Sequence, residues 1–214
     1  MARITVLGGT GYAGSAIARE AAARGHEVVA FSRKASDEAI EGIVSVTGSA
    51  QNRADLERAA AGAEVIVVAL APSGELQDGF VELNAEIAEL ARSRGARLGV
   101  VGGAGSLLVT ADGPKVYEAP WFPEQFREYA RISDAVLQSL RGSDPELDWF
   151  VLSPPRGFGS YAPGEATGTF RVGGEVMLTD GKGLAEISGA DFATAFVDEI
   201  ENLVHRRERF TVAY

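Results

Sequence analysis

The sequence predicts an α/β protein with a doubly wound parallel sheet flanked by helices and a small irregular C-terminal portion. Short apolar runs alternate with segments of helical periodicity along most of the 214 residues. The runs are nearly continuous, as in "EVIVVALA" at residues 64–71, which is typical of strands buried on both faces of a parallel sheet. Such an alternation implies right-handed crossovers between parallel strands.

The predicted elements of the core follow one another along the chain. Strands are expected at residues 4–7, 28–31, 43–46, 64–71, 97–101 and 148–152. Helices are expected at residues 11–24, 55–61, 78–94 and about 126–140. In the last two helices the apolar residues recur three and four positions apart, which predicts one buried helical face.

The last third of the chain has a different character. The stretch "SPPRGFGSYAPGEATGTF" is rich in Gly and Pro, and strand-like pieces follow at residues 169–172, 175–179 and 185–188, then a helix near 190–204 and a strand at 209–214. Residues 153–168 follow the carboxyl end of a strand, where open α/β sheets bind ligands. They are either a wall of a substrate pocket or a surface loop. We expect a single domain over residues 1–214, with a core at about 1–152 and a substrate-side segment at about 153–214.

Composition and charge exclude several classes of function. The net charge of −10 argues against general binding to nucleic acid, which needs clustered Lys and Arg. There is no cysteine, and His26 and His205 lie far apart, so no metal site is expected. No apolar run approaches the roughly 20 residues of a membrane span, and no signal-peptide pattern is present. We expect a cytoplasmic enzyme without a membrane partner, and the sequence is compatible with an oligomer.

A glycine-rich turn, "GGTGYAG" at residues 8–14, separates the first strand from the first helix. Gly8, Gly11 and Gly14 are three residues apart. Glycines at such a junction permit a tight turn and let the backbone approach a pyrophosphate, which the helix N-terminus attracts. Thr10 adds a hydroxyl. The turn therefore predicts a dinucleotide site, and the alternative is a glycine turn that binds nothing.

The end of the second strand selects the cofactor. An acidic residue there binds the ribose 2′-hydroxyl of NAD, whereas an Arg accommodates the 2′-phosphate of NADP. The sequence places Ser32, Arg33 and Lys34 at this point, with no acid before Asp37. Arg33 can clamp a phosphate at two points, with Ser32 beside it. This favours NADP(H) over NAD(H), and the alternative is a solvated basic pair at a strand end.

Several longer stretches carry a family resemblance. They are "VLGGTGYAGSAI", "GHEVVAFSRK", "VVGGAGSL", "LDWFVLSPP", "PGEATGTFRVGG", "ISGADFATAFVDEIE" and "HRRERFTV". Together they resemble the NADH-flavin reductase group of atypical short-chain dehydrogenases, which is related to biliverdin-IXβ/flavin reductases and to NmrA-like proteins. The resemblance spans almost the whole chain. It implies a Rossmann-like fold, binding of NAD(P)H, and flavin or quinone reduction.

The resemblance also implies which residues contact the cofactor. Phosphate contacts are expected from the glycine turn and contacts to the 2′-phosphate from the end of the second strand. The adenosine and ribose are expected along the segment after the fourth strand, and the nicotinamide beside the residues after the fifth and sixth strands. One departure is visible, because relatives carry Gly-Asp after the third strand where this chain has Gly48-Ser49. The implied contacts are Gly8, Thr10, Gly11, Tyr12, Gly14, Ser32, Arg33, Leu70, Ala71, Pro72, Gly102 and Pro154.

The catalytic Tyr-x-x-x-Lys pair of typical short-chain dehydrogenases is absent. Four residues after Tyr129, for example, the chain has Ser133. Reduction of a free flavin or a quinone tolerates this absence, because the acceptor can take its proton from water while the protein supplies proximity and orientation. Flavin is thus expected as a substrate and not as a tightly bound prosthetic group. Ser106 is the catalytic candidate, unless it only caps local backbone.

A planar acceptor requires apolar and aromatic walls. Aromatic residues follow the fifth and sixth strands, and Arg156 can meet an anionic tail of the acceptor. Two rival functions share the cofactor site, namely an NmrA-like sensor that holds NADP(H) without turnover and an epimerase or isomerase. The candidate acceptor contacts are Tyr117, Trp121, Phe122, Arg156, Phe158 and Tyr161.

Overall fold

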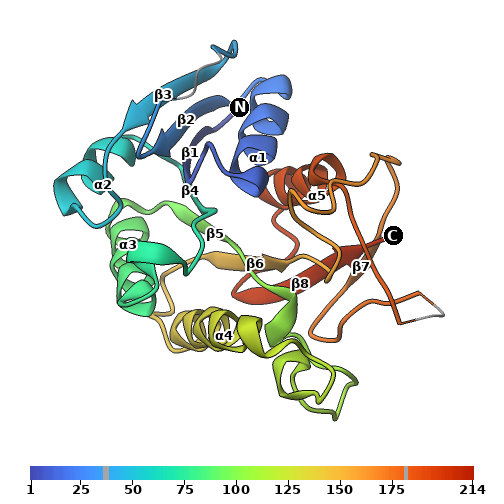
Figure 1. Ribbon diagram of the computed structural model, residues 1–214. Helices are drawn as coiled ribbons and strands as arrows, with labels where there is room; N and C mark the ends of the chain where they lie inside the picture. Colours follow the sequence, from blue (N-terminus) through green and yellow to red (C-terminus); the bar gives the residue numbers. More distant parts are fainter. Residues whose placement is uncertain (36–38, 181–182) are drawn as a thin grey trace.

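The computed structural model describes residues 1–35, 39–180 and 183–214, and Asp37 lies outside these ranges. Its strands form one eight-stranded sheet in the order β3-β2-β1-β4-β5-β6-β8-β7. Neighbouring strands are parallel except for β7, which pairs antiparallel with β8 at the edge. The strand order reverses between β1 and β4. Figure 1 shows this twisted sheet between two layers of helices, which confirms the predicted fold class.

The elements have the following bounds. The strands are β1 (Arg3–Leu7), β2 (Glu27–Ser32), β3 (Ile43–Thr47), β4 (Val65–Val68), β5 (Arg97–Val101), β6 (Trp149–Ser153), β7 (Arg171–Gly173) and β8 (Glu208–Ala213). The helices are α1 (Tyr12–Ala23), α2 (Arg53–Ala59), α3 (Phe80–Arg94), α4 (Arg127–Arg141) and α5 (Gly189–Asn202).

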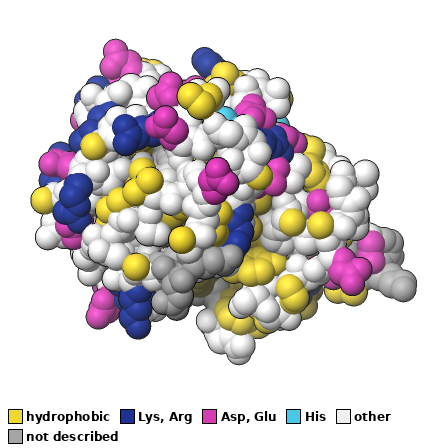
Figure 2. Space-filling view, turned by 90° about the horizontal axis from the view of Figure 1, so that it is seen from above, with side chains coloured by type: hydrophobic (Ala, Val, Ile, Leu, Met, Phe, Trp, Pro, Cys, Tyr) yellow, Lys and Arg dark blue, Asp and Glu magenta, His cyan; other side chains and the backbone are white. Residues whose placement is uncertain are grey.

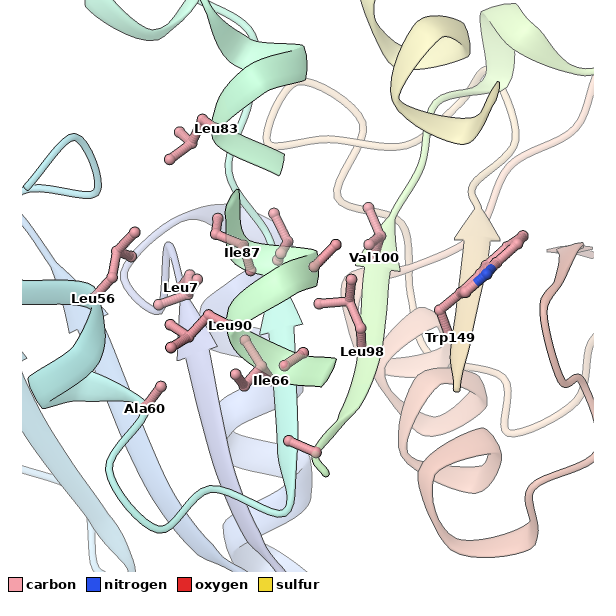
Figure 3. Close-up of a cluster of buried hydrophobic side chains, with 14 of the residues drawn as sticks. Leu7, Leu56, Ala60, Ile66, Leu83, Ile87, Leu90, Leu98, Val100 and Trp149 are labelled. Atoms are coloured by element: carbon pink, nitrogen blue, oxygen red, sulfur yellow. The ribbon is translucent and has the colours of Figure 1, made fainter. Parts of the chain in front are cut away.

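Each face of the sheet has its own hydrophobic core. Apolar side chains of α2, α3 and α4 pack on one face, where Ile87 and Leu98 are almost fully buried, and Figure 3 shows this cluster between α3 and the strands. Side chains of α1 and α5 pack on the other face around Phe192 and Phe196. Because β1 and β4 contribute buried side chains to both cores, their sequences read as continuous apolar runs.

The core elements match the sequence prediction to within a few residues, but two strands predicted near the C-terminus are wrong. Residues 175–179 and 185–188 form only isolated bridges, in which Val176 pairs with Leu108 and Glu186 with Gly157. Both partners lie outside the sheet. An apolar alternation identifies half-buried extended chain, whereas a strand also needs a neighbouring strand with free backbone groups.

A buried charged cluster ties α5 to the amino end of β5. The Arg97 guanidinium donates to Glu199 Oε1 and to the Glu199 carbonyl oxygen, both at 2.6 Å, and to the His205 carbonyl oxygen at 2.7 Å. The side chains of Arg97 and Glu199 are only 6% and 2% exposed. Buried charges of this kind are tolerated because each is paired and hydrogen-bonded.

Surface charges are mixed in sign. Basic and acidic side chains are interspersed on the face that Figure 2 shows, so this face lacks the basic stripe typical of nucleic-acid-binding proteins. Within the described ranges, no helix combines the length and the apolar character needed to cross a membrane. Nor do three or more His, Cys, Asp or Glu side chains of those ranges gather as metal ligands.

Replacement of Arg97 by Met is expected to lower the free energy of unfolding by about 3–5 kcal/mol, because Glu199 then stays buried without its cation. The exposed pair of Arg92 with Glu89 provides a control, and Arg92→Met is expected to cost only about 0–1 kcal/mol. Urea unfolding followed by circular dichroism measures both. Equal losses in the two variants would contradict the stabilising role assigned to the buried cluster.

Candidate functional site

Two glycines of the turn between β1 and α1 are required by close backbone contacts. Gly8 has a φ of +90°, in the left-handed region, and a Cβ there would lie 2.5 Å from the carbonyl oxygen of Ala69. A Cβ on Gly14 would lie 2.2 Å from the carbonyl oxygen of Gly8. Neither position has space for any side chain. These glycines shape the junction and let α1 pack against the turn.

Gly11 is different, because a Cβ there would contact only the Gly8 carbonyl oxygen, at 3.3 Å. Gly11 is the N-cap of α1, makes no side-chain cap, and is followed by a first turn without an acidic residue. The first N–H groups of α1 therefore face an open space with a positive dipole end, which suits a phosphate. The N–H groups of Gly8 and Gly9 donate to the Phe31 carbonyl oxygen and hold this turn beside the end of β2.

A cavity of about 530 Å³ opens directly in front of this helix end. It extends along the carboxyl ends of β1, β4, β5 and β6, so it spans the point where the strand order reverses, the usual ligand site of such sheets. The start of α4 and the loop after β6 close it. Among the predicted site residues, its lining includes Gly11, Tyr12, Leu70, Ala71, Gly102, Phe122, Pro154, Arg156, Phe158 and Tyr161.

Aromatic rings form much of the wall. Tyr12 packs edge-on against Phe158 with ring centroids 5.2 Å apart, and the Tyr161 hydroxyl donates to the Arg156 carbonyl oxygen at 2.9 Å. The Arg156 guanidinium lies over the Trp121 ring at 4.6 Å, a cation–π contact. Of the described residues that line the cavity, Arg156 alone carries a charge. The cavity therefore suits an apolar, planar molecule with an anionic group near the entrance.

The residues predicted to select the cofactor, Ser32 and Arg33, lie outside the lining of this cavity. Arg33 is exposed, and its guanidinium is 3.7 Å from the Glu75 carboxylate on the loop after β4. The Ser32 hydroxyl donates to the Lys34 carbonyl oxygen, so it is engaged within its own loop. Thr10 lines a separate cavity of about 340 Å³ together with Lys34.

Four further predicted residues lie outside the lining of the main cavity. Pro72 is buried and lines a separate small cavity, and the Lys115 ammonium group lies 5.9 Å from the centroid of the Tyr117 ring. Trp121 is not among the lining residues, but its ring packs against Arg156, which is. Ser106 is 3% exposed, its hydroxyl donates to the Gly103 carbonyl oxygen, and it accepts from the Arg209 guanidinium. The Ser106 hydroxyl is thus used within the fold, as the turn-capping alternative predicts.

Sequence reasoning missed Tyr129, which lines the cavity from the first turn of α4. Desolvation by burial raises the pKa of Tyr129, and Tyr161 raises it further. A tyrosine hydroxyl is protonated at neutral pH even with its ordinary pKa, and the upward shift keeps the Tyr129 hydroxyl a hydrogen-bond donor. The sequence signal for Tyr129 is its place on the helix after the fifth strand. The absence of a Lys four residues later, where the chain has Ser133, argues only against a catalytic Tyr–Lys pair and not against a place in the cavity wall. Phe126, 53% exposed, is a second missed lining residue.

A doubly wound sheet with a glycine turn, an uncapped helix end and a crevice at the strand reversal defines a dinucleotide-binding protein. The family model described as NAD(P)H-binding matches residues 8–202. The chain belongs to this NAD(P)H-binding family, which confirms the predicted membership in an atypical short-chain dehydrogenase group. The described residues fit the cofactor, because Gly11 leaves free the space in front of α1 that a pyrophosphate requires.

Proteins of similar length and fold are known. The "Uncharacterized protein YwnB" of Bacillus subtilis is 33% identical over 98% of this chain and 97% of its own. A "putative exported protein" of Burkholderia pseudomallei is 35% identical over both whole chains, with a TM-score of 0.86. A "putative NADH-flavin reductase" of Streptococcus pneumoniae is 31% identical, with a TM-score of 0.82, over 100% of this chain and 99% of its own.

The two kinds of glycine are expected to respond differently to alanine. Gly11→Ala should fold normally but bind NADPH about tenfold or more weakly, because its Cβ enters the space in front of α1. Gly14→Ala should be destabilised, because its Cβ collides with the backbone of Gly8. Thermal unfolding and NADPH fluorescence titration measure the two effects. Tight NADPH binding by a well-folded Gly11→Ala protein would exclude the phosphate site assigned here.

Proposed function

We propose that the protein is an NADPH-dependent reductase of a free planar acceptor, a flavin or a quinone. The observation that carries this proposal is the aromatic cavity that begins at the uncapped end of α1. Among its described lining residues, Arg156 has the single charged side chain. Of the described lining residues, none is Asp, Glu, Lys or His. Such a site binds and orients a planar molecule but offers no strong acid or base, so it suits hydride transfer to an acceptor that needs neither. The name of the Streptococcus relative, "putative NADH-flavin reductase", supports a flavin as the acceptor.

The cofactor end is assigned as follows. The N–H groups of the first turn of α1, starting at Tyr12, bind the pyrophosphate, because the Gly11 N–H already donates to the turn. Leu70 and Ala71 lie along the adenosine and ribose. Gly102 and Pro154 border the nicotinamide, where both line the cavity. Bound NADPH supplies a hydride from C4 of its nicotinamide. The protein excludes water around that position with the aromatic wall and brings the acceptor ring into stacking distance.

The acceptor end is assigned to the aromatic residues. Phe122, Phe158 and Tyr161 provide faces for a planar ring, and Tyr129 donates a hydrogen bond from a neutral hydroxyl to a carbonyl oxygen of the acceptor. Arg156, with its cation–π contact to Trp121, meets an anionic tail. The proton that accompanies the hydride comes from water. Ser106 has no part in this proposal, because its hydroxyl is turned to Gly103 and Arg209.

The assay that tests the activity follows NADPH oxidation at 340 nm with FMN, riboflavin and quinones. We expect turnover with flavins, and a higher kcat/KM for FMN than for riboflavin, because only FMN carries a phosphate for Arg156. The two flavins share one ring system, so riboflavin is the matched control. Tight NADPH binding without oxidation by any acceptor would overturn the reductase proposal in favour of an NADP(H) sensor.

Preference for NADPH is proposed because the end of β2 carries Ser32 and Arg33 where NAD-binding proteins have an acidic residue. Arg33→Ala is expected to weaken NADPH binding by about tenfold and NADH binding by much less, because a charged hydrogen bond contributes about 1.5–3 kcal/mol and this one is partly solvated. Arg53→Ala, on the exposed start of α2, is the control and should change neither. Isothermal titration with both cofactors measures the effect, and equal losses for the two would refute the role of Arg33.

A further inference from the structure

Asp191 is a buried carboxylate outside the cavity. It lies in the first turn of α5 and is 3% exposed. Its Oδ2 atom accepts hydrogen bonds from the Thr167 N–H at 2.7 Å and the Tyr214 hydroxyl at 2.6 Å, and its Oδ1 atom accepts from the Gly168 N–H at 3.1 Å. Burial raises its pKa, but the hydrogen bonds from Tyr214, Thr167 and Gly168 outweigh burial and hold the pKa below its usual value. Asp191 is therefore ionised at neutral pH.

The groups that face Asp191 are neutral donors. Besides Tyr214, they are two backbone N–H groups and the Thr167 hydroxyl, 3.3 Å away. No described Lys, Arg or His forms an ion pair with Asp191 at the distance of a salt bridge. A helix N-terminus alone does not explain this arrangement, because the cap of α5 is already provided by the Ser188 hydroxyl, which accepts from the Asp191 N–H.

Two partners of Asp191, Thr167 and Gly168, belong to residues 163–168, a segment that we name the strap. The strap has no regular secondary structure and its residues are exposed, so hydrogen bonds from side chains are needed to fix its position. Asp191 holds one end at Thr167 and Gly168. The Tyr214 oxygen, which accepts from the Ser188 N–H, lies 2.8 Å from the Glu165 carbonyl oxygen in the middle.

The other end of the strap reaches the cavity. The Tyr12 hydroxyl donates to the Pro163 carbonyl oxygen at 3.1 Å, and Tyr12 packs against Phe158, whose ring is 4.4 Å from that of Phe192 on α5. Gly189 permits this packing, because a Cβ there would lie 3.1 Å from the Tyr12 ring. A continuous series of contacts thus connects Asp191, through the strap, to two residues of the cavity wall.

We infer that Asp191 and Tyr214 are positioning residues of the acceptor site, which act by holding the strap and through it Tyr12 and Phe158. The inference rests on the proposed function and deepens it, because it assigns residues remote from the acceptor to the acceptor step. Neither side chain lines the cavity. The pyrophosphate contacts come from the backbone of α1 and do not depend on the strap. Loss of the strap is therefore expected to affect the acceptor and to spare NADPH.

The test compares Asp191→Asn and Tyr214→Phe with Glu199→Gln. Glu199 is an equally buried carboxylate on the same helix, about 12 Å further along it, and is hydrogen-bonded to Arg97 and His205. All three substitutions remove a buried hydrogen bond or charge, so all three are expected to lower the thermal stability. Only the first two are expected to lower kcat/KM for FMN, by about tenfold, while the Kd for NADPH stays within about twofold.

Two further measurements separate a positioning role from general destabilisation. The double variant Asp191→Asn/Tyr214→Phe should lose little more activity than either single variant, because both act through one strap. Hydrogen exchange at Thr167 and Gly168 should be faster in Asp191→Asn and unchanged in Glu199→Gln. Equal kinetic losses in all three variants, at matched loss of stability, would overturn the inference.

Binding of FMN to the NADP⁺-loaded protein, followed by flavin fluorescence, distinguishes this inference from the proposed function. Weaker FMN binding in Asp191→Asn supports the inference whether or not turnover occurs. Normal FMN binding and turnover in that variant overturn the inference and leave the proposed function intact. A wild-type protein that neither oxidises NADPH with any acceptor nor binds FMN overturns both.

Discussion

The arrangement of the site depends on the contact between the turn after β1 and the start of α1. Gly14 lies so close to the Gly8 carbonyl that even a methyl group does not fit, and Gly8 is equally close to the segment after β4. This contact places the end of α1 at the point where the strand order reverses. Because Gly11, between them, has no side-chain cap, the same packing leaves the helix N–H groups open toward the crevice. Close packing of α1 and access for a phosphate thus come from one short stretch of chain.

Charged side chains that lie outside the cavity lining hold several segments of the cavity wall. Arg127, at the start of α4, donates to the carbonyl oxygens of Tyr117, Ala119 and Phe122 and so fixes the loop that carries Trp121 and Phe122. Arg209, paired with Glu175, donates to the Ser106 carbonyl oxygen and hydroxyl and fixes the segment after β5. Asp191 does the same for the strap. Irregular loops have backbone groups without strand partners, so each loop around the site needs such a donor or acceptor to take one conformation.

Much of the fold could be predicted from the sequence because it depends on local patterns. Strands such as "VIVV" and the glycine turn carry their own periodicity and their own steric requirement, and the lining confirms that the turn, the residues after β4 and the loop after β6 lie together. Ser106 illustrates the limit, since a serine after a strand has the same local signal whether its hydroxyl faces a cavity or a buried arginine. The Arg209 that engages it lies 103 residues away. Partners this distant in sequence are brought together by the sheet order, which no local pattern specifies.

The chemistry available to Tyr129 depends on the absence of a lysine one turn further along the helix. On the helix after β5, a lysine one turn further along would lower the tyrosine pKa and allow proton exchange with a substrate alcohol. This chain has Ser133 there, and the Ser133 hydroxyl donates to the Tyr129 carbonyl oxygen instead of approaching the phenol. Burial and the neighbouring Tyr161 then raise the pKa of Tyr129. A phenol with a raised pKa transfers its proton to a substrate less readily, but it remains a good hydrogen-bond donor. It can orient an acceptor without titrating, which favours an acceptor that receives its proton from water over interconversion of an alcohol and a ketone.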